Sequence, residues 1–274
     1  MTRNFNSLLA ETQAVKKHLC VGLDPDFEKI PVHLRRLGVR EGLLAFNRGI
    51  VDATKEIAGS YKPNTAFFEA YGSEGWDVAK ETIRYIREHA PEAVVIADAK
   101  RADIGNTNNG YIEAIFGDLE ADAITVHPYL GSEALRPFLD RSDKGVFILC
   151  RTSNPGASEI QDLDVGGEPL YLHIARLVND AWNTNGNCGL VTGATYPEEI
   201  QRVRSVAPSL PLLIPGIGAQ GGDLEATVRA ARGGRMLISA SRSIMYASAG
   251  EDFAEAAERS AQELHRSITK AAVV

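Results

Sequence analysis

Short apolar segments alternate with longer amphipathic segments along almost the whole chain. The apolar segments are rich in Val, Ile and Leu, which is typical of parallel strands that are buried on both faces. The longer segments place apolar residues at helical spacing. This pattern predicts eight strands, near residues 18–24, 60–64, 93–97, 122–128, 145–153, 188–192, 211–215 and 236–239.

Helices are predicted before the first strand and between the strands. The clearest helical segments are residues 7–17, 40–58, 76–89 and 252–265. Parallel strands need crossover connections, so eight such units predict an α/β fold, a single (β/α)8 barrel. An open, doubly wound sheet is the competing fold. No linker or composition shift divides the chain, and residues 1–274 are therefore predicted to form one domain.

Composition and charge narrow the class of protein. Of the 274 residues, 44% are hydrophobic, which is enough for a full core and argues against disorder. The formal net charge of −7 argues against a general nucleic-acid binder, which needs a basic face. No stretch approaches the roughly 20 apolar residues that span a membrane, and the first residues do not resemble a signal peptide. We expect no nucleic-acid partner and no membrane association.

Three cysteines bear on the cellular compartment. Cys20, Cys150 and Cys188 lie far apart, each in a predicted strand. An odd number of cysteines without metal-ligand spacing predicts reduced, buried thiols and a cytoplasmic protein. The six histidines share no metal-ligand spacing either, so no metal site is expected.

One charged stretch follows the third predicted strand. In the sequence Asp-Ala-Lys-Arg-Ala-Asp, Asp98 and Lys100 are two residues apart, which predicts that their side chains project side by side from the strand end. Asp103 follows where the chain turns toward a helix, so two carboxylates are expected to bracket one ammonium. An isolated pair of this kind would be an ordinary surface ion pair. At the end of a buried strand the charges are costly unless they are used, which favours a functional site.

Other polar residues follow other predicted strands. Active sites of α/β barrels lie at the carboxyl ends of the strands, so these residues are expected to meet the charged stretch at one face of the barrel. Alone, Asp24 before Pro25 is best explained as a turn residue, and Lys62 is equally well explained as an ordinary charged strand end. The candidates outside the charged stretch are Asp24, Lys62, His127, Ser153, Gln220 and Arg242.

The two last strands are followed by a candidate phosphate site. Glycines 216, 218, 221 and 222 follow the seventh strand, and Arg242 follows the eighth. Barrel enzymes often hold phosphate in these two loops, where glycine lets backbone N–H groups approach and Arg adds charge. The spacing also satisfies G-x-G-x-x-G, but a dinucleotide site should open the first βαβ unit. A glycine-rich turn with only a structural role is the remaining alternative.

The stretch Asp98-x-Lys100-x-x-Asp103, followed by Ile104-Gly105 and Thr107, resembles the catalytic stretch of orotidine 5′-phosphate decarboxylases, in particular the longer bacterial subfamily (type 2). Matching segments occur in order along nearly the whole chain. The resemblance implies decarboxylation of orotidine 5′-monophosphate to UMP in pyrimidine biosynthesis, without a cofactor. It also implies a homodimer with shared active sites.

The resemblance assigns a role to each candidate residue. Asp24 and Lys62 would contact the ribose, and Lys62, Asp98, Lys100 and Asp103 would form an alternating charged array in which Lys100 stabilises and protonates the C6 carbanion. Asp103 and Thr107 would reach into the partner subunit's site. Ser153 would bind the pyrimidine, and Gln220 and Arg242 the phosphate. Ser241 departs from the family pattern, in which many relatives have a glycine before this arginine.

Three alternatives remain. A Mg²⁺-dependent phosphosugar decarboxylase or synthase of the same superfamily shares the acid-x-Lys-x-x-Asp strand, although Lys62 and the segment at Ser153 favour the pyrimidine enzyme. A Schiff-base aldolase using Lys100 is disfavoured because flanking carboxylates keep a lysine protonated. A catalytically silent nucleotide-phosphate binder is disfavoured by the intact charged array. The loops after Ser153 and around Gln220 are the candidate lids.

Overall fold

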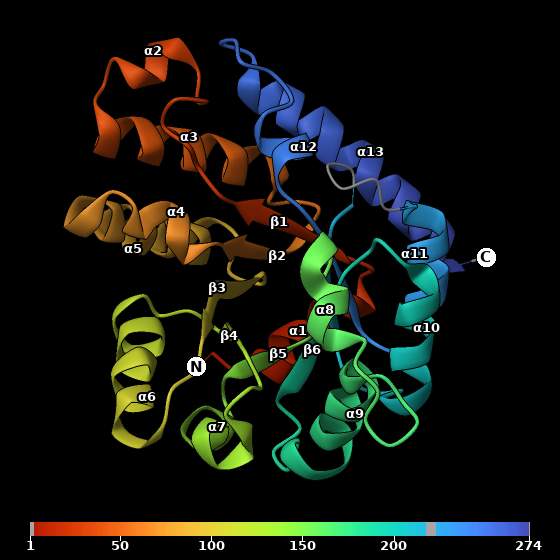
Figure 1. The fold of residues 1–274 in the computed structure, drawn as a ribbon. Helices are drawn as coiled ribbons and strands as arrows, with labels where there is room; N and C mark the ends of the chain where they lie inside the picture. Colours follow the sequence, from red (N-terminus) through yellow and green to blue (C-terminus); the bar gives the residue numbers. More distant parts are fainter. Residues whose placement is uncertain (1–2, 218–222, 274) are drawn as a thin grey trace.

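Eight parallel strands close into a barrel in the computed structural model, which describes residues 3–217 and 223–273 (Figure 1). Each strand pairs with its neighbours in sequence, and β1 pairs with β8 to close the sheet. The predicted (β/α)8 barrel is confirmed. The strands are β1 (Leu19–Leu23), β2 (Ala58–Pro63), β3 (Val94–Arg101), β4 (Ala123–Val126), β5 (Gly145–Arg151), β6 (Cys188–Thr192), β7 (Leu212–Pro215) and β8 (Met236–Ala240).

Helices surround the barrel and connect its strands (Figure 1). Their apolar faces pack on the outside of the sheet, which leaves polar faces toward water. The α-helices are α1 (Phe5–Ala14), α2 (Val32–Arg35), α3 (Val39–Thr54), α4 (Thr65–Glu69), α5 (Gly72–His89), α6 (Gly105–Ile112), α7 (Gly131–Leu139), α8 (Ser158–Gln161), α9 (Leu170–Leu177), α10 (Pro197–Val206), α11 (Leu224–Ala231), α12 (Arg242–Met245) and α13 (Phe253–Val273). Short π- or 3-10 segments are η1 (Glu113–Asp118), η2 (Pro155–Ala157) and η3 (Val178–Trp182).

Helix α1 closes the amino-terminal end of the barrel. Phe5 and Leu9 are fully buried with the residues that fill the barrel interior. The Phe5 ring packs edge-on against Phe147 of β5, with ring centroids 5.7 Å apart. Arg3 reinforces this closure by an ion pair with Asp122 at 2.8 Å, just before β4. One end is thus filled by side chains, which leaves the carboxyl ends of the strands as the open face.

The predicted elements differ from the observed ones mainly at their ends. The third strand extends to Arg101 and includes the charged stretch, whereas the apolar pattern had predicted an end at residue 97. The last helix continues from Phe253 to Val273, beyond the predicted end at 265. The three cysteines are free and buried, as expected. Among the described helices, none is long and apolar enough to cross a membrane.

Candidate active site

A buried carboxylate joins two lysines at the open end of the barrel. Lys62 is the second-last residue of β2, and Asp98 lies in the neighbouring strand β3. The Lys62 Nζ lies 3.1 Å from Asp98 Oδ2, and the Lys100 Nζ lies 2.6 Å from Asp98 Oδ1. The side chains of Lys62 and Asp98 are 7% and 11% exposed, while that of Lys100 is 49% exposed. The Lys100 ammonium is therefore the more exposed of the two.

Lys100 contacts Asp98 through a backbone geometry that differs from the predicted one. Simple strand alternation would have placed the two side chains side by side, but Lys100 has a left-handed backbone with φ of 48°. The pairing of β3 with β4 is interrupted between Ala97 and Arg101, where the strand bulges. A left-handed residue with a Cβ costs about 1–2 kcal/mol, so the surrounding structure must hold this conformation. The prediction of proximity is confirmed and its geometric reason is wrong.

The two charges of the buried pair stabilise each other. Burial alone would raise the pKa of Asp98, but the ammoniums of Lys62 and Lys100 and the hydrogen bonds from Lys100 and Thr125 outweigh it and hold this pKa well below its usual range. Burial alone would lower the pKa of Lys62, but the nearby carboxylates of Asp98 and Asp24 outweigh it and raise this pKa. The Lys62–Asp98 pair is therefore ionised at neutral pH.

Thr125 of β4 completes the cluster, although nothing in the sequence pattern singles it out. Its hydroxyl lies 2.9 Å from Asp98 Oδ1 and 3.0 Å from the backbone nitrogen of Lys100. The side chain is 1% exposed. The available signal was a hydroxyl-bearing residue within an otherwise apolar, buried strand, which is too common a feature to single out one threonine.

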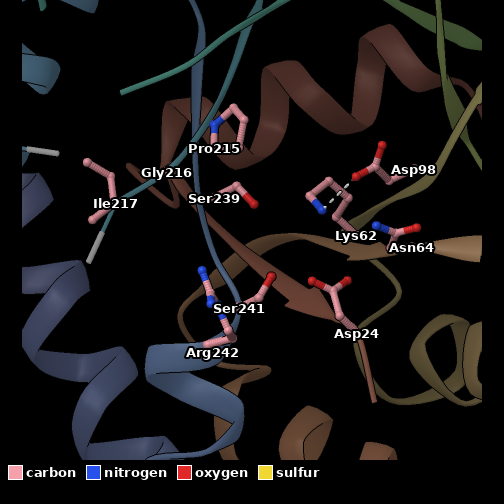
Figure 2. A pocket seen from close by; sticks show the side chains of 10 residues that line it. All are labelled: Asp24, Lys62, Asn64, Asp98, Pro215, Gly216, Ile217, Ser239, Ser241 and Arg242. Atoms are coloured by element: carbon pink, nitrogen blue, oxygen red, sulfur yellow. Dashed lines mark hydrogen bonds and ion pairs between the residues drawn. The ribbon is translucent and has the colours of Figure 1, made fainter. Parts of the chain in front are cut away.

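A cavity lies beside the charged cluster (Figure 2). Arg242 lies across this cavity from the Lys62–Asp98 pair, and the hydroxyl-bearing residues Ser239 and Ser241 lie between them. Asp24, which directly follows β1, lines the same cavity, so the structure brings together residues at the carboxyl ends of β1, β2, β3 and β8. The remaining lining residues, Asn64, Pro215, Gly216 and Ile217, come from the ends of β2 and β7.

The phosphate candidates are placed on one side of this cavity. Gly216 has a φ of 109°, a conformation that favours glycine, and it follows β7 directly. Arg242 is the first residue of α12 and has no ion-pair partner within residues 3–217 and 223–273. Gln220 lies outside the described residues, as do the glycines at 218, 221 and 222.

Ser153, the predicted pyrimidine residue, lines a second cavity and not the first one. This second cavity shares Lys62, Asp98 and Pro215 with the first one and is lined by Lys100, Ser153 and Gln161 as well. The Gln161 side chain in α8 accepts a hydrogen bond from the Thr152 backbone nitrogen at 2.8 Å. The loop after Ser153 is thus folded back onto the end of β5. Gln161 had not been singled out in the sequence.

Asp103 and Thr107 lie apart from the lysine cluster. The Asp103 Oδ1 accepts a hydrogen bond from the backbone nitrogen of Ile104 at 2.7 Å, and no ion pair links its carboxylate to Lys62 or Lys100 in the described chain. Thr107 is exposed near the start of α6. One chain therefore forms the Lys62–Asp98–Lys100 part of the predicted array, and the function of Asp103 and Thr107 stays a prediction.

Comparison with known proteins places this chain in a family. The sequence model that describes the orotidine 5′-phosphate decarboxylase / HUMPS family matches residues 17–259 of this chain. The chain belongs to this family. Named relatives are orotidine 5′-phosphate decarboxylases of Herpetosiphon aurantiacus (53% identical over 89% of this chain and 90% of the relative) and Azoarcus sp. (51% identical over 96% and 97%). The predicted family and enzyme class, a carboxy-lyase, are confirmed.

Solved structures give the same fold. The OMP decarboxylase of Leishmania donovani superimposes with a TM-score of 0.83, at 40% identity over 97% of this chain and 99% of that chain. The UMP synthase of the same organism superimposes with a TM-score of 0.85 at 41% identity, and this chain spans 57% of its length. The similarity thus covers nearly the whole barrel, including the strand ends that form the candidate site.

Proposed function

We propose that this protein decarboxylates orotidine 5′-monophosphate to UMP in pyrimidine biosynthesis, with Lys100 as the group that stabilises and protonates the C6 carbanion. The relatives named above support the activity. The observation that carries the residue assignment is the Lys100 ammonium, held 2.6 Å from a buried carboxylate at the open end of the barrel.

The two cavities offer places for each part of the substrate. Arg242 and the backbone near Gly216 would hold the phosphate, together with Gln220. Asp24 and Lys62 would bind the ribose hydroxyls between the phosphate and the charged cluster. Ser153, which shares the second cavity with Lys100, would bind the pyrimidine. In this orientation C6 and its carboxylate face Lys100 and Asp98.

Lys100 supplies a positive charge that can stabilise the carbanion formed at C6. When the bond between C6 and the carboxyl carbon breaks, CO₂ leaves and its electron pair stays on C6 in the plane of the ring, where the pyrimidine carbonyls cannot delocalise it. A fixed ammonium beside C6 stabilises this pair and then transfers one proton to it, which gives UMP and a neutral lysine that regains its proton from water. Catalysis must lower the barrier by on the order of 20 kcal/mol.

Asp98 keeps the ammoniums charged and aligned. Its ion pairs with Lys62 and Lys100 fix both lysines before substrate binds, so that little reorganisation is needed during the reaction. Its negative charge would also lie near the substrate carboxylate, where repulsion favours the departure of CO₂. Binding energy from the distant phosphate would be used to close the loops after Ser153 and around Gln220.

We further propose that the chain acts as a homodimer in the cytoplasm. Asp103, Thr107 and the 60% exposed Ile104 lie on the loop and helix start that follow β3, where a partner subunit can approach the site. Asp103 and Thr107 would then complete the partner's site, as the family resemblance implies. Three free, buried thiols support a reducing compartment.

The test is the ultraviolet absorbance change on conversion of orotidine 5′-monophosphate to UMP, with and without EDTA. Rapid conversion that EDTA does not slow is the expected result, and it would support both the substrate and a reaction without a metal. EDTA-sensitive turnover of a phosphosugar with no turnover of the nucleotide would instead identify a Mg²⁺-dependent member of the superfamily.

A further inference from the structure

Thr125 connects the two residues on which the proposed reaction depends. Its hydroxyl lies 3.0 Å from the backbone nitrogen of Lys100 and 2.9 Å from Asp98 Oδ1. The backbone N–H of Lys100 can only donate, so the hydroxyl oxygen accepts this bond and its single proton points to the carboxylate. Both hydrogen bonds are thereby assigned a direction.

The Lys100 backbone needs this acceptor because the sheet does not supply one. Pairing of β3 with β4 proceeds through Ala97 and resumes at Arg101, so Lys100 lies within the interruption. Its left-handed conformation is unfavourable for a residue with a side chain and persists only where contacts hold it. The Thr125 side chain reaches into the bulge and replaces the missing strand partner.

The same hydroxyl fixes the orientation of the Asp98 carboxylate. Asp98 Oδ2 faces Lys62 at 3.1 Å, while Oδ1 faces both Lys100 Nζ at 2.6 Å and Thr125 Oγ1 at 2.9 Å. Thr125 is fully enclosed in strand β4 and its side chain has little freedom, since β-branched residues are restricted at χ1. The carboxylate therefore cannot rotate toward one lysine without losing a hydrogen bond.

We propose that Thr125 is a positioning residue, whose hydroxyl holds the Lys100 ammonium and the Asp98 carboxylate in the geometry needed for decarboxylation. This inference rests on the proposed function. Thr125 also lines the cavity that Lys100 and Ser153 share, but its hydroxyl is already bonded to the Lys100 N–H and the Asp98 carboxylate, so it acts through these two groups. Its loss should reduce the rate of the chemical step more than the binding of the nucleotide.

Two pairs of variants isolate the hydroxyl. Thr125 and Thr125→Val have nearly the same shape, while Thr125→Ser and Thr125→Ala differ by a single oxygen atom. We expect Thr125→Val and Thr125→Ala to lower kcat by about 10- to 100-fold, because the buried N–H of Lys100 and the charged carboxylate of Asp98 would each lose a hydrogen-bond partner. KM should change less than about threefold, and Thr125→Ser should recover most of kcat.

Thr192→Val is the matched control. Thr192 is also buried in a barrel strand, and its hydroxyl has no hydrogen-bond partner in the part of the chain that the structure describes. This variant should keep the kcat of the unmodified protein. Urea unfolding of every variant separates an effect on the site from a general loss of stability.

The outcomes separate this inference from the proposed function. Unchanged kcat in Thr125→Val, or no recovery in Thr125→Ser relative to Thr125→Ala, would overturn the role of the hydroxyl even though the unmodified enzyme is active. If the unmodified protein does not turn over orotidine 5′-monophosphate, the proposed function fails. Crystal structures then test the positioning directly, because Lys100 should leave its left-handed conformation in Thr125→Ala and keep it in Thr125→Ser. An unchanged Lys100 in both variants would overturn the inference.

Discussion

Replacing Asp98 with asparagine should destabilise the protein strongly as well as inactivate it. The substitution keeps the shape of the side chain and removes its charge, which leaves the Lys62 ammonium buried without its partner at 3.1 Å. Two unit charges about 3 Å apart attract each other by roughly 5 kcal/mol at an effective dielectric constant of about 20. The half-exposed Lys100 contributes less, because water screens it. Breaking a buried pair typically costs about 3–5 kcal/mol, and we expect a loss in that range.

Urea unfolding at pH 7 measures this loss, and a second substitution shows its cause. Lys62→Met removes the buried cation, so the double variant Lys62→Met with Asp98→Asn should be more stable than Asp98→Asn alone. A pH series adds a second criterion. Because the folded-state pKa of Asp98 lies below its usual value near 3.9, its stabilisation is present above about pH 4 and is lost as the pH falls through the folded-state pKa. The difference in the free energy of unfolding between the unmodified protein and Asp98→Asn should therefore shrink as the pH falls below about 4.

The electrostatic reasoning would be refuted if Asp98→Asn unfolded within about 1 kcal/mol of the unmodified protein. It would equally be refuted if removing Lys62 in the Asp98→Asn background caused a further loss. Either result would mean that the ammonium of Lys62 is not stabilised chiefly by this carboxylate.

Three further predictions concern substitutions of single residues. Arg242→Ala should raise KM for orotidine 5′-monophosphate by about 10- to 100-fold in steady-state assays and leave the binding of unphosphorylated uridine unchanged. Gly193→Ala should lower activity and cost about 1–3 kcal/mol in urea unfolding, because a Cβ there would lie 2.7–2.8 Å from Ser153 atoms. Arg204→Leu should cost about 3 kcal/mol or more, because the buried guanidinium donates to five backbone carbonyls; a melting temperature within 2 °C of the parent would contradict this.

The barrel could be predicted because its signal is repeated. Each buried strand is an apolar segment of its own, and eight such segments with helices between them leave few possible architectures. The closure of the amino-terminal end of the barrel was harder to predict from the sequence. Phe5 and Leu9 fit an ordinary amphipathic helix in the sequence, and only the structure shows that they seal the amino-terminal end of the barrel. Packing partners far apart in sequence leave no local pattern.

The candidate site was predicted as a set of residues more reliably than as a geometry. Asp24, Lys62, Asp98, Lys100 and Arg242 do line adjoining cavities, because all lie in or just beyond the carboxyl ends of strands that meet at one face. The left-handed backbone of Lys100 could not be predicted, since nothing local in a lysine favours it.

The residues that support the site were missed for a related reason. The hydroxyl of Thr125 and the amide of Gln161 matter only through partners in other elements, which the sequence does not display. Asp103 differs from these residues, because the sequence motif does single it out but its expected role depends on a second chain. Its carboxylate bonds to the neighbouring backbone here, and the sequence motif alone does not say which subunit's lysines it would face.

The most direct test of the central claim compares Lys100→Ala with the unmodified protein in the ultraviolet assay. Lys55→Ala is the control, because Lys55 also pairs with an aspartate, Asp52 at 3.2 Å, but lies at the end of α3 away from the site. We predict that Lys100→Ala folds, still binds UMP and shows no measurable decarboxylation, while Lys55→Ala is fully active. Turnover by Lys100→Ala close to that of the unmodified protein would contradict the assignment of Lys100 as the group that stabilises and protonates the carbanion.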